Sequence, residues 1–260
     1  MPVPEVSVMR AALFIATALL LAACQSSGTR EGSSKENDRI KLADINTQLA
    51  IAYMQDGDNE LALRKLESAL ESNPKSVNAH NALALLYNNI GEYPQAEENY
   101  RKALALDARN ITALNNYGRF LCQQKRYEEG QSRFKEAMDN PLNPTPENAM
   151  ANAGTCAMQS GDTVRAEDLF RSALQRSSRL PPALLSMAQL SLDQQNPLQA
   201  RAYYQRYTEV SPQSPRTLWL GMRIEQALGN QDGVASYALQ LKNRFPDSPE
   251  YGQYQRGELE

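Results

Sequence analysis

Residues 77–110 read VNAHNALALLYNNIGEYPQAEENYRKALALDARN, and this stretch decides the fold. It contains two segments with apolar residues at helical spacing, separated by a turn at Gly91. The marker residues are Leu83, Ala84 and Tyr87 in the first segment and Ala96, Tyr100 and Ala103 in the second. The stretch therefore predicts two helices that pack through one apolar face each.

The same pattern returns about every 34 residues in both directions along the chain. The proline-rich segment 140–146, NPLNPTP, shifts the register by two residues. The predicted units are 43–76, 77–110, 111–146, 147–180, 181–214 and a degenerate 215–248. Small residues recur where two helices should cross closely, and aromatic residues fill the next groove. The small residues are Ala84, Gly118, Gly154 and Ala188, and the aromatic ones are Tyr100, Phe134, Phe170 and Tyr204.

This period and its residues resemble the tetratricopeptide repeat, abbreviated TPR. The resemblance implies an all-α fold: a right-handed superhelical solenoid of about six helix-turn-helix repeats over residues 40–248. Six repeats exceed the roughly three that a continuous core needs. Residues 249–260 are polar and predict a C-terminal cap or tail.

The N-terminus has the features of an export signal. Residues 11–23 read AALFIATALLLAA after the basic residue Arg10, and this stretch of 13 residues, apolar except for Thr17, is too short to span a bilayer. Whether the signal starts at Met1 or Met9 stays open. Residues 21–24, LAAC, resemble the lipobox of bacterial lipoproteins. The resemblance implies removal of residues 1–23 and acylation of Cys24.

Two further expectations follow from this terminus. Gln25 stands where inner-membrane lipoproteins usually carry Asp, so the resemblance implies the outer membrane. Residues 24–39 should then be the lipidated cysteine and a flexible tether, because they lack apolar periodicity. The alternative is an ordinary secretory signal followed by a chance cysteine.

Cys122 and Cys156 remain after Cys24 is assigned to the lipid. They are an even pair in an oxidising compartment and fall in the first helices of neighbouring repeats, which predicts a disulfide. A bond that closes a loop of this length would contribute about 3–4 kcal/mol in the chain-entropy model. The alternative is two buried thiols that act as small apolar groups.

The TPR resemblance also implies that the first helix of each repeat lines a concave surface. Carried over onto this sequence, the candidate partner-binding groove comprises Asn78, Asn81, Leu85, Asn88, Asn89, Asn115, Arg119, Trp219 and Arg223. Amides donate and accept hydrogen bonds, so this surface could hold the backbone of an extended segment. The alternative is a solvated helix face, and for Trp219 core packing is equally open.

Composition points away from catalysis and from nucleic acid. His80 is the only histidine and falls at a core position. The chain therefore has no second histidine to bind zinc, and no exposed histidine to activate a cysteine nucleophile. The net charge is −3 and basic residues are scattered, which disfavours nucleic acid. We therefore expect no enzyme, no cofactor, no metal and no small-molecule substrate.

Two stretches are more specific than a generic repeat. Residues 115–121, NNYGRFL, are followed by QKRYEE, and residues 218–224, LWLGMRI, are followed by ASYALQLK. Together with the lipobox they resemble the PilF/PilW family of type IV pilus biogenesis lipoproteins. The resemblance implies a monomeric pilotin at the periplasmic face of the outer membrane. Such a protein binds pilus secretin subunits and promotes their localisation and multimerisation. The competing hypothesis is a TPR lipoprotein scaffold for cell-wall synthesis or outer-membrane protein assembly.

Overall fold

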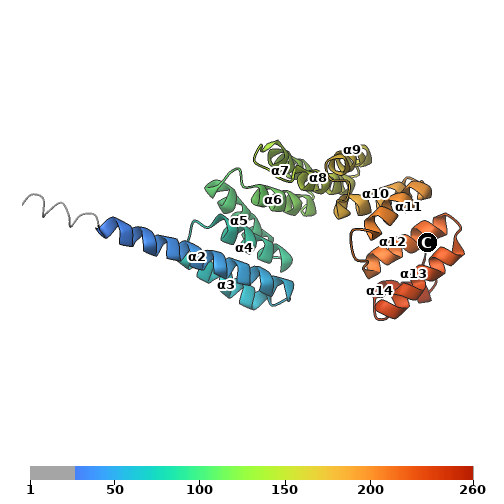
Figure 1. The fold of residues 1–260 in the computed structure, drawn as a ribbon, viewed down its shortest axis with the longest axis horizontal. Coiled ribbons are helices and arrows are strands. Elements are labelled where there is room, and N and C mark those ends of the chain that lie inside the picture. Colours follow the sequence, from blue (N-terminus) through green and yellow to red (C-terminus); the bar gives the residue numbers. More distant parts are fainter. Residues whose placement is uncertain (1–26, 260) are drawn as a thin grey trace, which may run out of the picture. The chain divides into compact units, whose positions relative to one another are not determined.

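The computed structural model describes residues 27–259, and this part of the chain consists of thirteen helices and their connections, with no strand (Figure 1). The predicted signal peptide, residues 1–23, and the predicted lipidation site Cys24 lie outside the described residues. In chain order the helices are α2 (Ser27–Gln55), α3 (Asn59–Ser72), α4 (Val77–Asn89), α5 (Tyr93–Leu106), α6 (Ile111–Gln123), α7 (Tyr127–Asp139), α8 (Pro146–Ser160), α9 (Thr163–Arg176), α10 (Pro181–Asp193), α11 (Pro197–Thr208), α12 (Pro215–Ala227), α13 (Gln231–Arg244) and α14 (Pro249–Gln255).

The helices pack in consecutive pairs, α2 with α3 through to α12 with α13. The first helices of the second to sixth pairs begin at Val77, Ile111, Pro146, Pro181 and Pro215. These starts lie within one residue of the predicted repeat boundaries. The prediction of an all-α solenoid of TPR repeats is confirmed.

Local sequence explains where the helices begin and turn. The Ser214 side chain accepts from the Thr217 backbone and the Thr217 side chain accepts from the Ser214 backbone, which forms a capping box at the start of α12. The turn inside each repeat needs one residue with positive φ. Four repeats place a glycine there, while the third and fifth use Lys125 (φ 61°) and Gln195 (φ 59°). Non-glycine residues in this region carry backbone strain.

The described chain divides into two compact units, unit 1 before and unit 2 after the boundary between residues 108 and 109. In the described part of unit 1, α3 and α4 share a core that includes Leu66, Leu83 and Leu86. Unit 2 has a larger core over α8 to α12, centred on Phe170, Met187 and Tyr204. In both units the core belongs to helix interfaces between neighbouring repeats, as expected for a repeat architecture.

The predicted pairing of small and aromatic residues appears at the helix crossings. A Cβ built on Gly118 would lie 2.7 Å from Cε1 of Phe134, and one built on Gly154 would lie 2.7 Å from Cε1 of Phe170. The third and fourth repeats therefore use glycine because the aromatic ring occupies the space of a methyl group.

The flexible tether predicted for residues 24–39 is wrong over its described part, because α2 begins at Ser27. The segment contains helix-forming Arg30, Glu31, Lys35 and Glu36 and no proline. Once the packed end of α2 is helical, each further residue adds one backbone hydrogen bond at little cost. Residues 34–42 of α2 are exposed. This part of α2 therefore needs no apolar face, and its sequence has no helical apolar period.

The C-terminal residues form a packed element. Tyr251 and Tyr254 of α14, together with Leu259 after it, pack against a buried cluster of α12 and α13. The predicted cap or tail at residues 249–260 is thus a short helix on the last repeat. Within residues 27–259 no helix is both long and apolar enough to cross a membrane.

Candidate partner-binding surfaces

Unit 1 exposes large apolar side chains on α2. Ile45 is 54% exposed and Leu49 is 41% exposed. The residues one repeat later, Ala79 and Leu83, are buried against α3. No described helix precedes α2, so the face that α3 covers on α4 stays uncovered on α2. We call the exposed face formed by Leu42, Ile45 and Leu49 the open face of α2.

The amide wall predicted on α4 is only partly available. Asn78 and Asn89 are exposed, and Leu85 and Asn88 are half-buried. Asn81 is 7% exposed, so the prediction that it faces a partner is wrong. Asn81 also makes an interaction within the chain. Buried amides are usually hydrogen-bonded within the protein, so little of this side chain is left for a partner.

His80 occupies the core position expected for it. Its Nδ1 lies 3.0 Å from Oδ1 of Asn99 and its Nε2 lies 3.1 Å from the carbonyl oxygen of Pro74. The Asn99 amide in turn donates to the carbonyl of Gln95. The imidazole therefore links α4, α5 and the loop before α4, which is a structural role.

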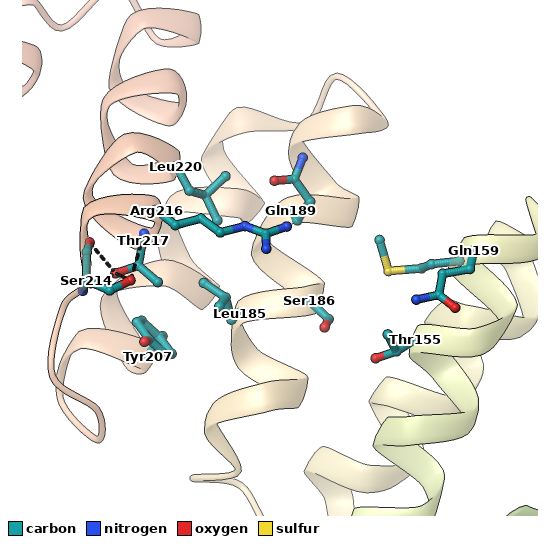
Figure 2. A pocket seen from close by; sticks show the side chains of 11 residues that line it. Thr155, Gln159, Leu185, Ser186, Gln189, Tyr207, Ser214, Arg216, Thr217 and Leu220 are labelled. Carbon is teal, nitrogen blue, oxygen red and sulfur yellow. Dashed lines mark hydrogen bonds between the residues drawn. The ribbon is translucent and has the colours of Figure 1, made fainter. Parts of the chain in front are cut away.

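Unit 2 contains a hollow on the face formed by the first helices of its last three repeats (Figure 2). We call it the C-terminal groove, and its cavity volume is about 660 Å³. Its lining comes mainly from α8, α10 and α12. The lining residues are Thr155, Met158, Gln159, Leu185, Ser186, Gln189, Tyr207, Ser214, Arg216, Thr217 and Leu220. This volume is in the range of ordinary ligand pockets, about 300–1,000 Å³.

Arg216 is the one charged residue in that lining. It is exposed and makes no ion pair with any residue in the described range. Figure 2 shows its guanidinium extending from α12 into the space beside Leu185 and Gln189. The Ser214 and Thr217 hydroxyls next to it are occupied by the capping box. The groove thus offers one available cation over a partly apolar floor.

A smaller cavity of about 150 Å³ shares Thr155 and Gln159 with the C-terminal groove and reaches Arg119 on α6. Cys122 and Cys156 line it, and the structure joins them in a disulfide with a Cα–Cα distance of 5.6 Å. Asn115 beside it donates to the Ile111 carbonyl and accepts weakly, at 3.5 Å, from Asn152. Arg119 is exposed, whereas Asn115 is half-buried.

Trp219 and Arg223 are not among the residues that line the C-terminal groove. Trp219 is half-buried and packs on the cluster of Leu218, Met222 and Leu241 that α14 covers. Of the two alternatives for this tryptophan, core packing therefore prevails. Arg223 is half-buried one turn further along α12.

The described residues hold no group of three His, Cys, Asp or Glu side chains close enough to bind a metal ion. What both units offer are surfaces of helical repeats, which suit protein partners.

Comparisons with known proteins identify the family of this chain. Tetratricopeptide repeat family models match residues 47–111, 89–130 and 157–218. The type IV pilus assembly protein PilF of Pseudomonas aeruginosa is 38% identical over 247 residues, which cover 95% of this chain and 98% of that protein. This chain belongs to the PilF family.

Solved structures of the PilF family agree with this fold. P. aeruginosa PilF superposes with a TM-score of 0.69 at 38% identity, over 85% of this chain and 99% of that one. PilW, described as a widely conserved type IV pilus biogenesis factor, superposes with a TM-score of 0.72 at 32% identity, over 82% and 98%. The PilF/PilW resemblance drawn from the sequence is confirmed, and the chain is a TPR protein of type IV pilus biogenesis.

Two surface features of this PilF family member were missed from the sequence: the open face of α2 and the part of the C-terminal groove that the fifth repeat forms. The open face of α2 could have been found from Ile45 and Leu49, which occupy positions that are buried in the second repeat. The groove residues Leu185 and Gln189 occupy the concave positions of the fifth repeat. Tyr207 gave no signal, because it belongs to a second helix, α11.

Proposed function

We propose that this protein is a pilotin: a lipoprotein, acylated at Cys24, that binds pilus secretin subunits and promotes their localisation and multimerisation in the outer membrane. The observation that carries the proposal is the 38% identity to PilF across 95% of the chain. The lipobox-like residues 21–24 support the anchor. Two or more acyl chains hold a protein stably at a membrane, whereas one holds it only marginally.

The open face of α2 is the surface we assign to the secretin. In the second repeat, α3 covers the equivalent apolar positions. A partner segment that forms an amphipathic helix can cover Ile45 and Leu49 in the same way. Burying one such side chain contributes roughly 1.5–3 kcal/mol before the cost of association. The anchor adds a high effective concentration of captured subunits near the membrane.

The first experiment deletes the gene, fractionates the envelope and probes the pilus secretin for heat- and detergent-resistant multimers. We expect multimers to be lost from the outer membrane, and to be restored by the wild-type chain but not by Cys24→Ala. Secretin multimers that form and localise normally without the protein would contradict the proposal. Altered cell shape or general porin loss in the same strain would instead favour the competing envelope scaffold.

The second experiment tests the surface. The double variant Ile45→Ser, Leu49→Ser should fail to restore secretin multimers while its melting temperature stays close to wild type, because both side chains are exposed. Leu239→Ser is the matched control, since Leu239 is an exposed leucine on α13 in unit 2. It should restore multimers fully. Equal restoration by both variants would exclude the open face as the secretin site.

A further inference from the structure

The C-terminal groove has the chemistry of a peptide site, and it lies in a different unit from the open face of α2. We propose that it binds an extended peptide segment in which an acidic side chain pairs with Arg216 and a neighbouring large apolar side chain enters the cavity. The proposal rests on this groove alone and holds whether or not the bound partner is a secretin.

The exposed charge of Arg216 is the reason to expect an acidic side chain in the peptide. Arg216 is exposed, extends into the cavity and has no ion-pair partner among residues 27–259 (Figure 2). None of the described lining residues is acidic. Asp193, one turn beyond Gln189 on α10, already accepts from the Gln189 amide at 2.7 Å. A guanidinium binds a carboxylate through two parallel N–H groups, so a single acidic side chain completes this site.

The apolar side chains at the floor of the groove are the reason to expect a large apolar side chain in the peptide. Leu185 and Met158 are half-buried and pack against the core of unit 2, and Tyr207 and Leu220 belong to that core. Their remaining exposed surface faces the cavity of about 660 Å³. A pocket with an apolar floor and a few polar groups is the usual form of a ligand site. A leucine or phenylalanine side chain of the peptide would remove this surface from water.

The polar rim of the groove and the distance across its helices indicate that the bound peptide is extended. Gln159 on α8 and Ser186 and Gln189 on α10 line the groove together with Arg216 on α12. They carry donors and acceptors that suit a peptide backbone. Packed helices lie about 8–10 Å apart, and an extended chain advances about 3.3 Å per residue. About six residues of an extended peptide are therefore enough to cross α8, α10 and α12, whereas a compact ligand would not reach all three helices.

Because the groove has a single cation, the carboxylate that it binds belongs to a side chain of the peptide and not to its C-terminus. A clamp for a peptide C-terminus needs several Lys and Arg residues, and this groove presents one. We therefore assign the negative charge to an aspartate or glutamate side chain within the segment. Probe peptides with amidated C-termini isolate that contribution.

The experiment measures binding of fluorescein-labelled, amidated hexapeptides to the full chain by fluorescence anisotropy. The peptides contain one phenylalanine and one aspartate in a serine background, with asparagine or lysine replacing the aspartate in the matched probes. We expect the aspartate peptide to bind roughly five- to fifty-fold more tightly than the asparagine peptide. Arg216→Gln should remove this difference. Arg165→Gln, which removes an exposed arginine on α9 outside the groove, should keep it.

Two further variants keep the proposal falsifiable if Arg216→Gln disturbs folding. Arg216→Glu should reverse the preference from the aspartate to the lysine peptide, a gain that a misfolded chain cannot show. Ser186→Phe should fill the cavity and weaken every probe. The proposal is overturned if no probe binds at about 1 mM or if aspartate and asparagine peptides bind equally. One more probe is the asparagine peptide with a free C-terminal carboxylate. The proposal is likewise overturned if that probe binds as tightly as the amidated aspartate peptide, or if Ser186→Phe binds like wild type.

Discussion

At the scale of single residues, the chain places two unusual backbone positions where its other repeats use glycine. Lys125 and Gln195 have φ near 60°, a region that costs non-glycine residues about 1 kcal/mol or more. Lys125→Gly should therefore raise the free energy of unfolding by about 0.5–1 kcal/mol, after allowing for the added entropy of the unfolded chain. Urea denaturation measures this. The reverse change Gly91→Lys should destabilise by a similar amount, and a neutral effect of both changes would argue against strain at this turn.

Gly154 tests the tight crossing of α8 and α9. Gly154→Ala adds a methyl group that would lie 2.7 Å from the Phe170 ring, and we expect a loss of about 1–3 kcal/mol despite the better helix propensity of alanine. Phe170→Leu should cost less in the Gly154→Ala background than in the wild type, because the smaller side chain relieves the clash. Thermal unfolding of the four proteins in this cycle gives the coupling, and strictly additive effects would contradict the packing explanation.

At the scale of elements, α14 closes the last repeat. Deleting residues 249–260 should uncover Trp219, Phe245 and the cluster beneath them, which lowers the stability of α12 and α13. Trp219 is the only tryptophan, so its fluorescence reports on this site directly. We expect a red-shifted emission and faster amide exchange in α13. Unchanged emission would mean that α14 does not shield the ring.

The helices themselves were largely predictable, because each repeat carries its own apolar period, its cap and its turn residue. The N-terminal half of α2 was not, since residues 34–42 are exposed and helix continuity there depends on the packed turns that follow. The candidate site was less predictable than the fold. Asn81 and Trp219 occupy positions that family geometry assigns to the concave side, yet one is buried and the other packs under α14. Burial at such positions depends on which helix lies opposite, and a single repeat does not contain that information.

At the scale of the whole molecule, the two units differ in how they are held together. Unit 2 contains the Cys122–Cys156 bond, which joins α6 to α8 across the proline-rich segment 140–146. Unit 1 depends on packing in its described part, and its first helix keeps an uncovered apolar face. The two proposed sites differ in the same way: the open face on unit 1 is uncovered, whereas the groove on unit 2 begins at α8, which the disulfide joins to α6.

The bond should therefore stabilise unit 2 selectively. The double variant Cys122→Ser, Cys156→Ser opens a loop with a sequence separation of 34, and we expect a loss of about 3–4 kcal/mol in the unfolding of unit 2. Hydrogen exchange resolved by segment should show faster opening of α6 and α8, while exchange in α3 and α4 stays unchanged. Because Cys122 and Cys156 are buried, the serine hydroxyls add their own cost, so the reduced wild-type protein is the necessary comparison. If reduction leaves exchange in α6 and α8 as it was, or if unreduced protein from the envelope shows two free thiols by mass spectrometry, the two cysteines act as packed thiols and the joint between the third and fourth repeats is held by packing alone.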